Sequence, residues 1–570
     1  MRYFVLATDY DGTLAEHGTV PYETTLALKQ LRDSGRHLVC VTGRLLPDLQ
    51  KTYPDWEIFR FVVAENGALL FDVLAKTETP LTTTPPAAFA ETLKRKGVNP
   101  LEQGNVIVST TDLYKQQVLE TISELGLELQ IIFNKGSAMV LPSGVNKATG
   151  LEAAVRTLGM SLHNVVGIGD AENDHAFLRA CGCSVAVANA IPYLKEEADL
   201  VTRSEAGKGV AELAARIIEN DLADVPAKNK ESESLLLGNV DDREIRVPFF
   251  GSTLLVAGPS GGGKSTLTTG VMERLTDAKY QFLSIDPEGD YQQFEGALVF
   301  GDAKRPPTLD ETLNALEHGE KNIILNLLGV HVDDRPDFFE KLVPPLQELR
   351  TRTGRPHWII VDEAHHLMPA SRERTKEALP QDWSSALFIT LQPDRMADHI
   401  LASINHLIAV GERPDETFQK FCRTSQSECP EVQPGELKKG TALIWAKKSS
   451  KEAQLFSVLP CRTQQARHSR KYAGADLAPD RSFYFRGPEA KLNLRAPNLV
   501  TFVRLLEGVD DETWLYHLHR GDYSEWFRTN IKSDDLAEAT KEVEARDELS
   551  AAESRARVKE QIEQRFTLPA

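Results

Sequence analysis

Short apolar runs that each end in polar residues constrain the fold of this chain more than any other feature. Four of these runs are "HLVCVTG" (37–43), "VVGIGD" (165–170), "WIIVDE" (358–363) and "ALFITLQ" (386–392). Runs of this length, alternating with helical stretches, predict buried parallel strands whose carboxyl ends carry the functional residues. We therefore expect an α/β fold in each of the two regions that contain them.

Two polar segments divide the chain, which at 570 residues is too long for a single ordinary core. The segment at 221–234 contains "ADVPAKNKESES" and predicts a linker, and the segment at 466–482 predicts a connector. The expected domains are an α/β domain at 1–220, a second α/β domain at 235–465 and a small, mostly helical domain at 483–570.

Composition limits the cellular compartment and the classes of partner that we expect for the protein. A formal net charge of -18 argues against a surface coated with basic residues for nucleic acid, although it leaves room for a local basic channel. No run approaches the ~20 apolar residues of a membrane span, and "MRYFVLATDYDG" turns polar too early for a signal peptide, so we expect a cytoplasmic protein. The six cysteines are few and scattered, and we expect small core residues in a reducing compartment rather than zinc ligands.

Two aspartates follow the first apolar run, in "FVLATDYDGTL". A carboxylate held at a strand end, as Asp9 is expected to be, can attack phosphorus and form an aspartyl-phosphate. Asp11, two residues on, can protonate the leaving oxygen and later activate water. The alternative is a simple turn in which the aspartates hydrogen-bond to nearby backbone groups.

Three more motifs carry groups that suit phosphoryl transfer. Thr42 in "VTGR" offers a hydroxyl for a phosphoryl oxygen, and Lys147 in "GVNKATGL" offers a cation that neutralises the transferring group. Asp170, Asn173 and Asp174 in "VVGIGDAENDHAFL" place carboxylates where Mg²⁺ is commonly bound beside phosphate. Taken singly, these residues could be a turn hydroxyl, a surface lysine and a helix cap.

The four motifs "DYDGT", "VTGR", "NKATG" and "GDAEND" resemble those of the haloacid dehalogenase (HAD) superfamily of phosphatases, over roughly residues 1–220. "VVAENGALLF", which contains Glu65, Asn66 and Gly67, resembles the Cof-type branch, subclass IIB, in which a cap domain lies between the second and third motifs. Here residues 80–142 fill that position. The resemblance implies a Rossmann-like parallel sheet with a small α+β cap, and a small phosphorylated metabolite of the phosphoglycolate or sugar-phosphate type as substrate.

The same resemblance implies a role for each motif residue. Asp9 would be the nucleophile and Asp11 the acid and base, while Thr42 and Lys147 would hold the phosphoryl group. Mg²⁺ would be bound by Asp9, the main-chain carbonyl of Asp11 and Asp170, with Asp174 in support, and Asn173 would lie beside them.

A second phosphate site is predicted by "TLLVAGPSGGGKSTLTTG", a strand followed by a glycine-rich turn and a helix start. It fits the pattern G-x-x-x-x-G-K-[ST], in which backbone N–H groups surround nucleotide phosphates. Lys264 would reach the β- and γ-phosphates of ATP, and Ser265 would bind Mg²⁺. The predicted nucleotide-binding residues are Gly258, Pro259, Ser260, Gly261, Gly262, Gly263, Lys264, Ser265 and Thr266.

The run "HWIIVDEAHHL" supplies the partner of this loop. Asp362 can hold a Mg²⁺-bound water and Glu363 can polarise the attacking water, a pair that favours ATP hydrolysis over phosphate transfer to another substrate. His365 and His366 are interpreted as helix-start residues, with a coupling role as the alternative.

Other strand ends of the second region fit the same site. "FLSIDPEGDY" carries Asp286 and Glu288 after a strand, and Gln392 in "LFITLQPDRM" is expected to sense the γ-phosphate. Arg413 in "HLIAVGERPDE" is a candidate arginine finger that would act on a neighbouring subunit, with a surface salt bridge as the alternative.

Residues 235–465 resemble the HerA/FtsK clade of P-loop ATPases, specifically the HerA/VirB4-like group, through "GPSGGGKST", "IDPEGDY", "IIVDEAHHLMP" and "ITLQPDRM". The resemblance implies a RecA-like P-loop α/β domain that binds and hydrolyses ATP. Members of the clade commonly form hexameric rings that move DNA or protein. The chain departs from that pattern because it has no room for the amino-terminal barrel of HerA proteins, which places a hexamer and DNA translocation in question.

The last region contains "YHLHRGD", with His517, His519 and Asp522. A metal site is one interpretation, but a packed and capped helix is favoured because no further ligand cluster is evident. We expect this domain to serve interaction or regulation.

The leading hypothesis is a bifunctional Mg²⁺-dependent hydrolase, a phosphatase coupled to an ATP-hydrolysing domain. The first alternative is a nucleic-acid processing enzyme that translocates DNA and trims phosphate ends. The second is a phosphatase that an ATP-sensing domain regulates with little turnover.

Overall fold

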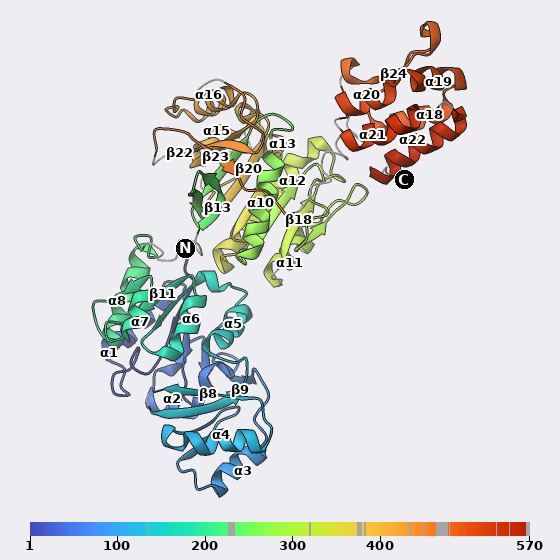
Figure 1. Ribbon diagram of the computed structural model, residues 1–570. Helices are drawn as coiled ribbons and strands as arrows, with labels where there is room; N and C mark the ends of the chain where they lie inside the picture. Colours follow the sequence, from blue (N-terminus) through green and yellow to red (C-terminus); the bar gives the residue numbers. More distant parts are fainter. Residues whose placement is uncertain are drawn as a thin grey trace. The chain divides into compact units, whose positions relative to one another are not determined.

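The computed structural model describes residues 1–570 apart from a set of short segments. These are 135, 226–233, 319–320, 373–378, 381–382, 433–434, 448–449, 463–476, 478, 532, 547 and 566–570. Most of the predicted linker and connector therefore lies outside the described residues. The chain forms two compact units, Met1–Cys461 and Arg462–Ala570 (Figure 1). Within the described part of the chain, no helix combines the length and apolar character needed to cross a membrane.

An eight-stranded sheet organises the first 220 residues. The chain runs parallel through six of its strands, and the motif-bearing strands β10, β1 and β2 are adjacent. In order across the sheet, the strands are β12 (Leu200–Val201), β11 (Cys183–Ala186), β10 (Val165–Gly169), β1 (Val5–Thr8), β2 (His37–Val41), β3 (Phe61–Ala64), β4 (Leu69–Asp72) and β5 (Thr77–Pro80). The helices are α1 (Tyr22–Asp33), α2 (Leu46–Thr52), α5 (Lys147–Thr157), α6 (His175–Ala180), α7 (Pro192–Glu197) and α8 (Ala206–Asn220).

The predicted parallel sheet is present, but it is mixed at one edge. Strands β4 and β5 run antiparallel at its edge, because the short turn η2 (Glu65–Gly67) returns the chain directly beside β3. Glu65 and Asn66 have φ of 52° and 56° in this turn, the left-handed conformation that tight reversals require. A direct reversal of this kind can only make an antiparallel pair, since a parallel strand needs a crossover.

A small second sheet lies between the second and third motifs, in the interval predicted for the cap. Its four strands are antiparallel, in the order β6 (Leu101–Gln103), β7 (Val108–Thr111), β9 (Ser137–Pro142) and β8 (Leu129–Asn134). Helices α3 (Ala87–Arg95) and α4 (Lys115–Glu124) pack on one face of this sheet through Phe89, Leu93 and Val118 (Figure 1). We call α3 to β9 the cap.

An eleven-stranded sheet forms the second α/β region. In order, its strands are β14 (Arg243–Pro248), β13 (Ser234–Val240), β23 (Gln454–Val458), β22 (Thr441–Ala446), β21 (His406–Val410), β15 (Thr253–Ala257), β20 (Ala386–Thr390), β19 (Trp358–Val361), β16 (Phe282–Asp286), β18 (Asn322–Asn326) and β17 (Ala297–Phe300). The strands from β21 to β17 are parallel, and β14, β13, β23 and β22 extend the sheet with antiparallel pairs.

Both faces of this sheet are covered. The side chains of β15 alternate, so that Leu254 and Val256 join the core that contains α10 (Lys264–Asp277), whereas Leu255 and Ala257 join the core that contains α12 (Arg335–Thr353). The remaining helices are α11 (Leu309–His318), α13 (Ala364–Leu367), α15 (Asp398–Ser403) and α16 (Pro414–Ser425).

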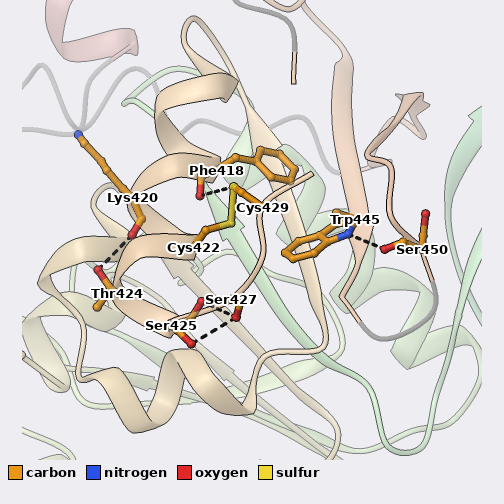
Figure 2. Close-up of a disulfide and its surroundings, with 9 residues drawn as sticks. All are labelled: Phe418, Lys420, Cys422, Thr424, Ser425, Ser427, Cys429, Trp445 and Ser450. Carbon is orange, nitrogen blue, oxygen red and sulfur yellow. Dashed lines mark hydrogen bonds between the residues drawn. A yellow bond between two sulfur atoms is a disulfide. The ribbon is translucent and has the colours of Figure 1, made fainter. Parts of the chain in front are cut away.

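A disulfide joins the end of α16 to the loop that follows (Figure 2). Cys422 and Cys429 pair with a Cα–Cα distance of 5.6 Å, because Gln426 takes a left-handed conformation and turns the chain back after the helix. This pairing corrects the expectation that the cysteines are reduced core residues. Cys40 and Cys183 are buried and lie outside this disulfide, as expected.

The second unit is mostly helical around one aromatic core. A short hairpin, β24 (Phe483–Phe485) and β25 (Leu494–Ala496), packs against the helices through Phe483 and Phe485. The helices are α18 (Leu499–Gly508), α19 (Asp511–Arg520), α20 (Asp522–Thr529), α21 (Asp534–Glu544) and α22 (Ala551–Arg565).

Candidate functional site

Three buried carboxylates gather at the carboxyl end of the first sheet. Asp9 follows β1, Asp170 follows the adjacent β10, and Asp174 ends the short helix η5 (Glu172–Asp174). One carboxylate oxygen of each lies within 4.8 Å of the others. The parallel pairing of β1 with β10 produces this cluster, because it brings two strand ends to the same edge.

Lys147 lies inside the carboxylate cluster. Its Nζ is 2.5 Å from Asp9 Oδ1 and 2.6 Å from Asp174 Oδ1, and its side chain is 1% exposed. Lys147 begins α5, whose start is fixed by Asn146 through hydrogen bonds to the backbone N–H groups of Ala148 and Thr149. Gly67 permits the approach of this helix, since a Cβ there would lie 1.9 Å from the carbonyl oxygen of Asn146.

The electrostatics of the cluster favour a bound divalent cation. Burial, followed by the neighbouring Asp174 and Asp170 carboxylates, raises the pKa of Asp9 to about 8, while Lys147 acts in the opposite direction. Burial lowers the pKa of Lys147, but the Asp174 and Asp9 carboxylates raise it by more, so the ammonium stays charged. Three carboxylates and one ammonium leave excess negative charge in a buried site, and these oxygen donors fit Mg²⁺.

Asp174 and Thr13 hold the cluster in place. Asp174 Oδ2 accepts hydrogen bonds from the backbone N–H groups of Asp170 and Ala171 at 2.9 and 3.0 Å, while its other oxygen faces Lys147. Thr13 Oγ1 donates to Asp170 Oδ1 at 2.8 Å. Both oxygens of Asp174 are therefore engaged by the protein, which suits a supporting role better than direct metal binding.

Asp11 is paired with Arg44, a residue that the sequence analysis did not single out. Arg44 Nε and Nη2 donate to the two carboxylate oxygens of Asp11, each at 2.7 Å, and Arg44 Nη1 donates to Asp48 at 2.5 Å. Arg44 lies in the "VTGR" motif with Thr42, whose buried Oγ1 accepts a hydrogen bond from the Arg44 N–H at 3.1 Å. The bidentate pair fixes the position of Asp11, the expected acid and base.

Asn173 connects the cluster to the turn after β3. Its Nδ2 donates to Oδ1 of Asn66 at 3.4 Å, and the N–H of Asn66 donates to the carbonyl of Thr42. The structure thus brings together all of the residues predicted for the first site, Asp9, Asp11, Thr42, Lys147, Asp170, Asn173 and Asp174.

The glycine-rich turn of the second region lies between β15 and α10. Gly258 and Gly263 have φ of 149° and 99° there, and a Cβ at Gly258 would lie 2.2 Å from the carbonyl oxygen of Val410. The Lys264 ammonium donates to the carbonyls of Gly258 and Pro259, each at 2.9 Å, so it closes the loop on itself. Ser265 follows on the first turn of α10, while the Thr266 side chain is exposed.

The acidic pair of the second region lies two strands from this turn. Asp362 and Glu363 follow β19, which is separated from β15 by β20 alone, and both are 5% exposed. Glu363 has φ of 44°, and its N–H donates to Oδ1 of Asp362 at 2.9 Å. Gln392 follows β20, between the acidic pair and the turn, and its N–H donates to Thr390 Oγ1.

His365 has contacts beyond those of a helix-start residue. Its Nδ1 is 3.1 Å from Thr390 Oγ1 and 3.4 Å from the Glu363 carboxylate. Burial, followed by repulsion from His366 and Arg395, lowers the pKa of His365 to about 4, so the ring is neutral at pH 7. His365 therefore lies between Glu363 and the end of β20, which Gln392 follows.

The last two candidate residues of the second region differ in burial, since Arg413 is exposed and Asp286 is buried. The Arg413 side chain is 64% exposed and pairs with Glu416 in the first turn of α16, the helix that Arg413 precedes, which matches the salt-bridge alternative. Asp286 is fully buried at the end of β16, and burial raises its pKa to about 7.

In the described part of the second unit, His517 is held by hydrogen bonds to protein groups and not placed as the metal ligand considered from the sequence. His517 Nδ1 is 2.7 Å from the Asp522 carboxylate, and its Nε2 accepts hydrogen bonds from the N–H groups of Arg486 and Gly487. Both ring nitrogens are therefore occupied by the protein, as expected for a packed helix.

Comparison with known proteins concerns the first region of the chain. The family model of the haloacid dehalogenase-like hydrolases matches residues 6–99 and 89–213. A phosphoglycolate phosphatase from Methanothermobacter thermautotrophicus is 32% identical over 219 residues, which cover 37% of this chain and 98% of that protein. Phosphoglycolate phosphatase 2 from Saccharolobus solfataricus is 31% identical over 229 residues, 38% of this chain and 93% of that protein. A solved haloacid dehalogenase-like hydrolase from Bacteroides thetaiotaomicron, 20% identical, covers 38% of this chain and 99% of its own, with a TM-score of 0.33.

Proposed function

Since the chain belongs to the haloacid dehalogenase-like hydrolases through residues 6–213, we propose that it is a Mg²⁺-dependent phosphatase whose substrate is a small phosphorylated metabolite of the phosphoglycolate or sugar-phosphate type. The observation that carries the proposal is the position of Lys147, bonded to both Asp9 and Asp174 inside the carboxylate cluster. The names of these two relatives support phosphoglycolate as the first substrate to test.

In the proposed reaction, Asp9 attacks the phosphorus atom of the substrate and forms an aspartyl-phosphate. Thr42 and Lys147 hold the phosphoryl oxygens, and Lys147 offsets their negative charge. Arg44 first releases one oxygen of Asp11, which takes up a proton from solvent. Asp11 gives this proton to the leaving oxygen, and its carboxylate then takes a proton from the water that hydrolyses the intermediate. Mg²⁺, held by Asp9, the Asp11 carbonyl and Asp170 and supported by Asp174, would supply further positive charge at the phosphoryl group.

The substrate is tested by phosphate release from a panel with Mg²⁺ and without ATP. The panel contains phosphoglycolate, several sugar phosphates and DNA that ends in a 3′-phosphate. We expect release from one or more of the small metabolites by the wild type and none by Asp9→Asn. The matched control is Asp33→Asn, since Asp33 is 67% exposed at the end of α1 and is expected to leave the rate unchanged. Release from DNA alone would favour the nucleic-acid alternative.

We further infer that residues 235–465 bind and hydrolyse ATP. The strand order β21-β15-β20-β19-β16 supports this inference, because it lines up the glycine-rich turn, Gln392 and the acidic pair along one edge of the sheet. Lys264 and the turn residues 258–266 would hold the phosphates, and Ser265 and Asp362 would hold Mg²⁺. Glu363 would polarise the attacking water, with Gln392 as the γ-phosphate sensor.

Hydrolysis is tested by ATP turnover in the wild type and in Glu363→Gln, which should bind ATP without hydrolysing it. A wild type as slow as this variant would favour the ATP-sensor alternative.

The arginine-finger role of Arg413 requires that the chain form a homo-oligomer. ATP turnover by Arg413→Ala tests that role. DNA binding that weakens steeply as salt rises would support translocation.

A further inference from the structure

A buried glutamate connects the core of the phosphatase to its cap. Glu65 follows β3 in the turn η2 and is 2% exposed. Its Oε1 accepts a hydrogen bond from the N–H of Asn105 at 2.8 Å, and its Oε2 accepts from Val106 and Ile107 at 2.8 and 2.9 Å. The donors form the turn between β6 and β7 of the cap, about forty residues away along the chain.

The fit between Glu65 and this cap turn is close. The turn is closed by the N–H of Gly104, which donates to the carbonyl of Ile107 at 2.9 Å. A Cβ at Gly104 would lie 2.5 Å from Cδ of Glu65 and 2.6 Å from a methyl group of Leu45. Only glycine therefore leaves room for the carboxylate to reach the three N–H groups.

The backbone of Glu65 is tied to the phosphoryl-binding motif on its other side. The N–H of Glu65 donates to the carbonyl of Arg44 at 3.0 Å, and the N–H of Asn66 donates to the carbonyl of Thr42 at 3.0 Å. A second contact joins the cap to the same motif, because Met139 of β9 places its sulfur 3.4 Å from the point where a Cβ of Gly43 would be. Glu65 thus bonds to the cap through its side chain and to the catalytic core through its backbone.

We propose that Glu65 is a positioning residue that fastens the cap turn at 104–107 to the core beside Thr42 and Arg44. This inference rests on the phosphatase activity proposed above. Glu65 touches no reacting atom in the proposed mechanism, and its effect is exerted through the cap, which it holds at a fixed place over the carboxylate cluster. Loss of this tie loosens the cap, so the substrate binds more weakly while the carboxylate cluster itself stays assembled.

The substitution Glu65→Gln tests the tie with the smallest change in shape. Three backbone N–H groups bond to two carboxylate oxygens, whereas a carboxamide replaces one oxygen with an NH₂ group that cannot accept. At least one of the three N–H groups therefore loses its acceptor in either orientation of the amide. Glu65→Ala removes all three acceptors and has the larger effect, but it also risks the fold.

Gly104→Ala tests the same contact from the cap side. Its added methyl group would displace the Glu65 carboxylate, so its defect should match that of Glu65→Gln. The matched control is Glu78→Gln. Glu78 is exposed and accepts a hydrogen bond from the side chain of Asn105, so it contacts the same turn without holding its backbone.

The first readout is hydrogen exchange of peptides that span residues 101–111 in the full chain. We expect exchange at 105–107 to become at least 10-fold faster in Glu65→Gln and Gly104→Ala and to stay unchanged in Glu78→Gln. Peptides that carry Asp9 and Asp170 should exchange at wild-type rates in all three variants. Unchanged exchange at 105–107 in Glu65→Gln would overturn the proposal.

The second readout is kinetic. We expect KM for the best substrate of the panel to rise about 10-fold in Glu65→Gln and Gly104→Ala, with kcat reduced less than 3-fold. A loss confined to kcat would show that Glu65 acts in the chemical step and would overturn its assignment as a positioning residue. If the wild type hydrolyses no substrate, the proposed function fails, but the hydrogen-exchange readout still decides the role of Glu65.

Discussion

Replacement of Lys147 by methionine tests the electrostatic balance of the first site. The substitution keeps most of the side-chain volume and removes the ammonium that bonds to Asp9 and Asp174 at 2.5 and 2.6 Å. The lysine is 1% exposed, so water cannot replace it at the two carboxylates. Removal of one partner from a buried ion pair typically costs about 3–5 kcal/mol.

The same change acts on the chemistry through the nucleophile. Lys147 lowers the pKa of Asp9 against a rise that burial and the neighbouring carboxylates cause. Without the lysine, the pKa of Asp9 rises further and less of the carboxylate is ionised at pH 7. The variant also loses a cation that stabilises the transferring phosphoryl group. We expect the two effects together to reduce phosphatase kcat by about 10²–10³-fold.

Urea unfolding and phosphate release at saturating Mg²⁺ measure the two effects. The control is Lys29→Met, because Lys29 forms a single ion pair with Asp55 in which both side chains are more than one-third exposed. Such a pair contributes about 0–1 kcal/mol and the control should keep its phosphatase rate. If Lys147→Met retained the stability and kcat of the wild type, the reasoning would be refuted.

Three further predictions concern other parts of the chain. Lys264→Ala should abolish ATP hydrolysis. Without ATP, its phosphatase rate should equal that of the wild type. A difference in phosphatase rate that appears only when ATP is added would demonstrate coupling of the two domains. Arg44→Ala should reduce kcat about 10–100-fold because Asp11 loses its positioning partner, and an unchanged pH–rate profile and kcat would contradict that role. Burial, followed by repulsion from His163 and Arg355, lowers the pKa of His357 well below its usual value. As the pH falls below ~6.5, a proton therefore binds at this position in the unfolded chain before it binds in the folded chain, and folding stability decreases. His357→Asn keeps an acceptor for the Gln281 N–H and should flatten this decrease in urea midpoints, whereas His331→Asn, on the surface, should not.

The sequence was sufficient to predict which residues meet at the first site. Asp9, Thr42 and Asp170 each follow an apolar run, and parallel strands bring such ends to one edge of the sheet. That rule requires no knowledge of side-chain packing. It applies equally to the second sheet, where the glycine-rich turn and Asp362 also follow strands.

Contacts that depend on tertiary geometry could not be predicted in this way. The Arg44–Asp11 pair joins residues 33 positions apart, and Glu65 bonds to cap residues about forty positions further along the chain. The local spacing of residues therefore predicts neither contact. The disulfide depends on the left-handed turn after α16, which a generic "RTSQSEC" sequence does not specify. The antiparallel edge of the first sheet depends on a turn made by Glu65 and Asn66 without the usual glycine at either position.

The most direct test of the account is to trap the covalent intermediate that Asp9 is proposed to form. The wild type would be quenched with acid during turnover of its best substrate and treated with borohydride, which reduces an aspartyl-phosphate to homoserine. Mass spectrometry of the peptide that carries residues 1–20 should then show homoserine at position 9, and the same peptide from Asp9→Asn should show none. Homoserine at a different aspartate, or phosphate release by Asp9→Asn at the wild-type rate, would contradict the account.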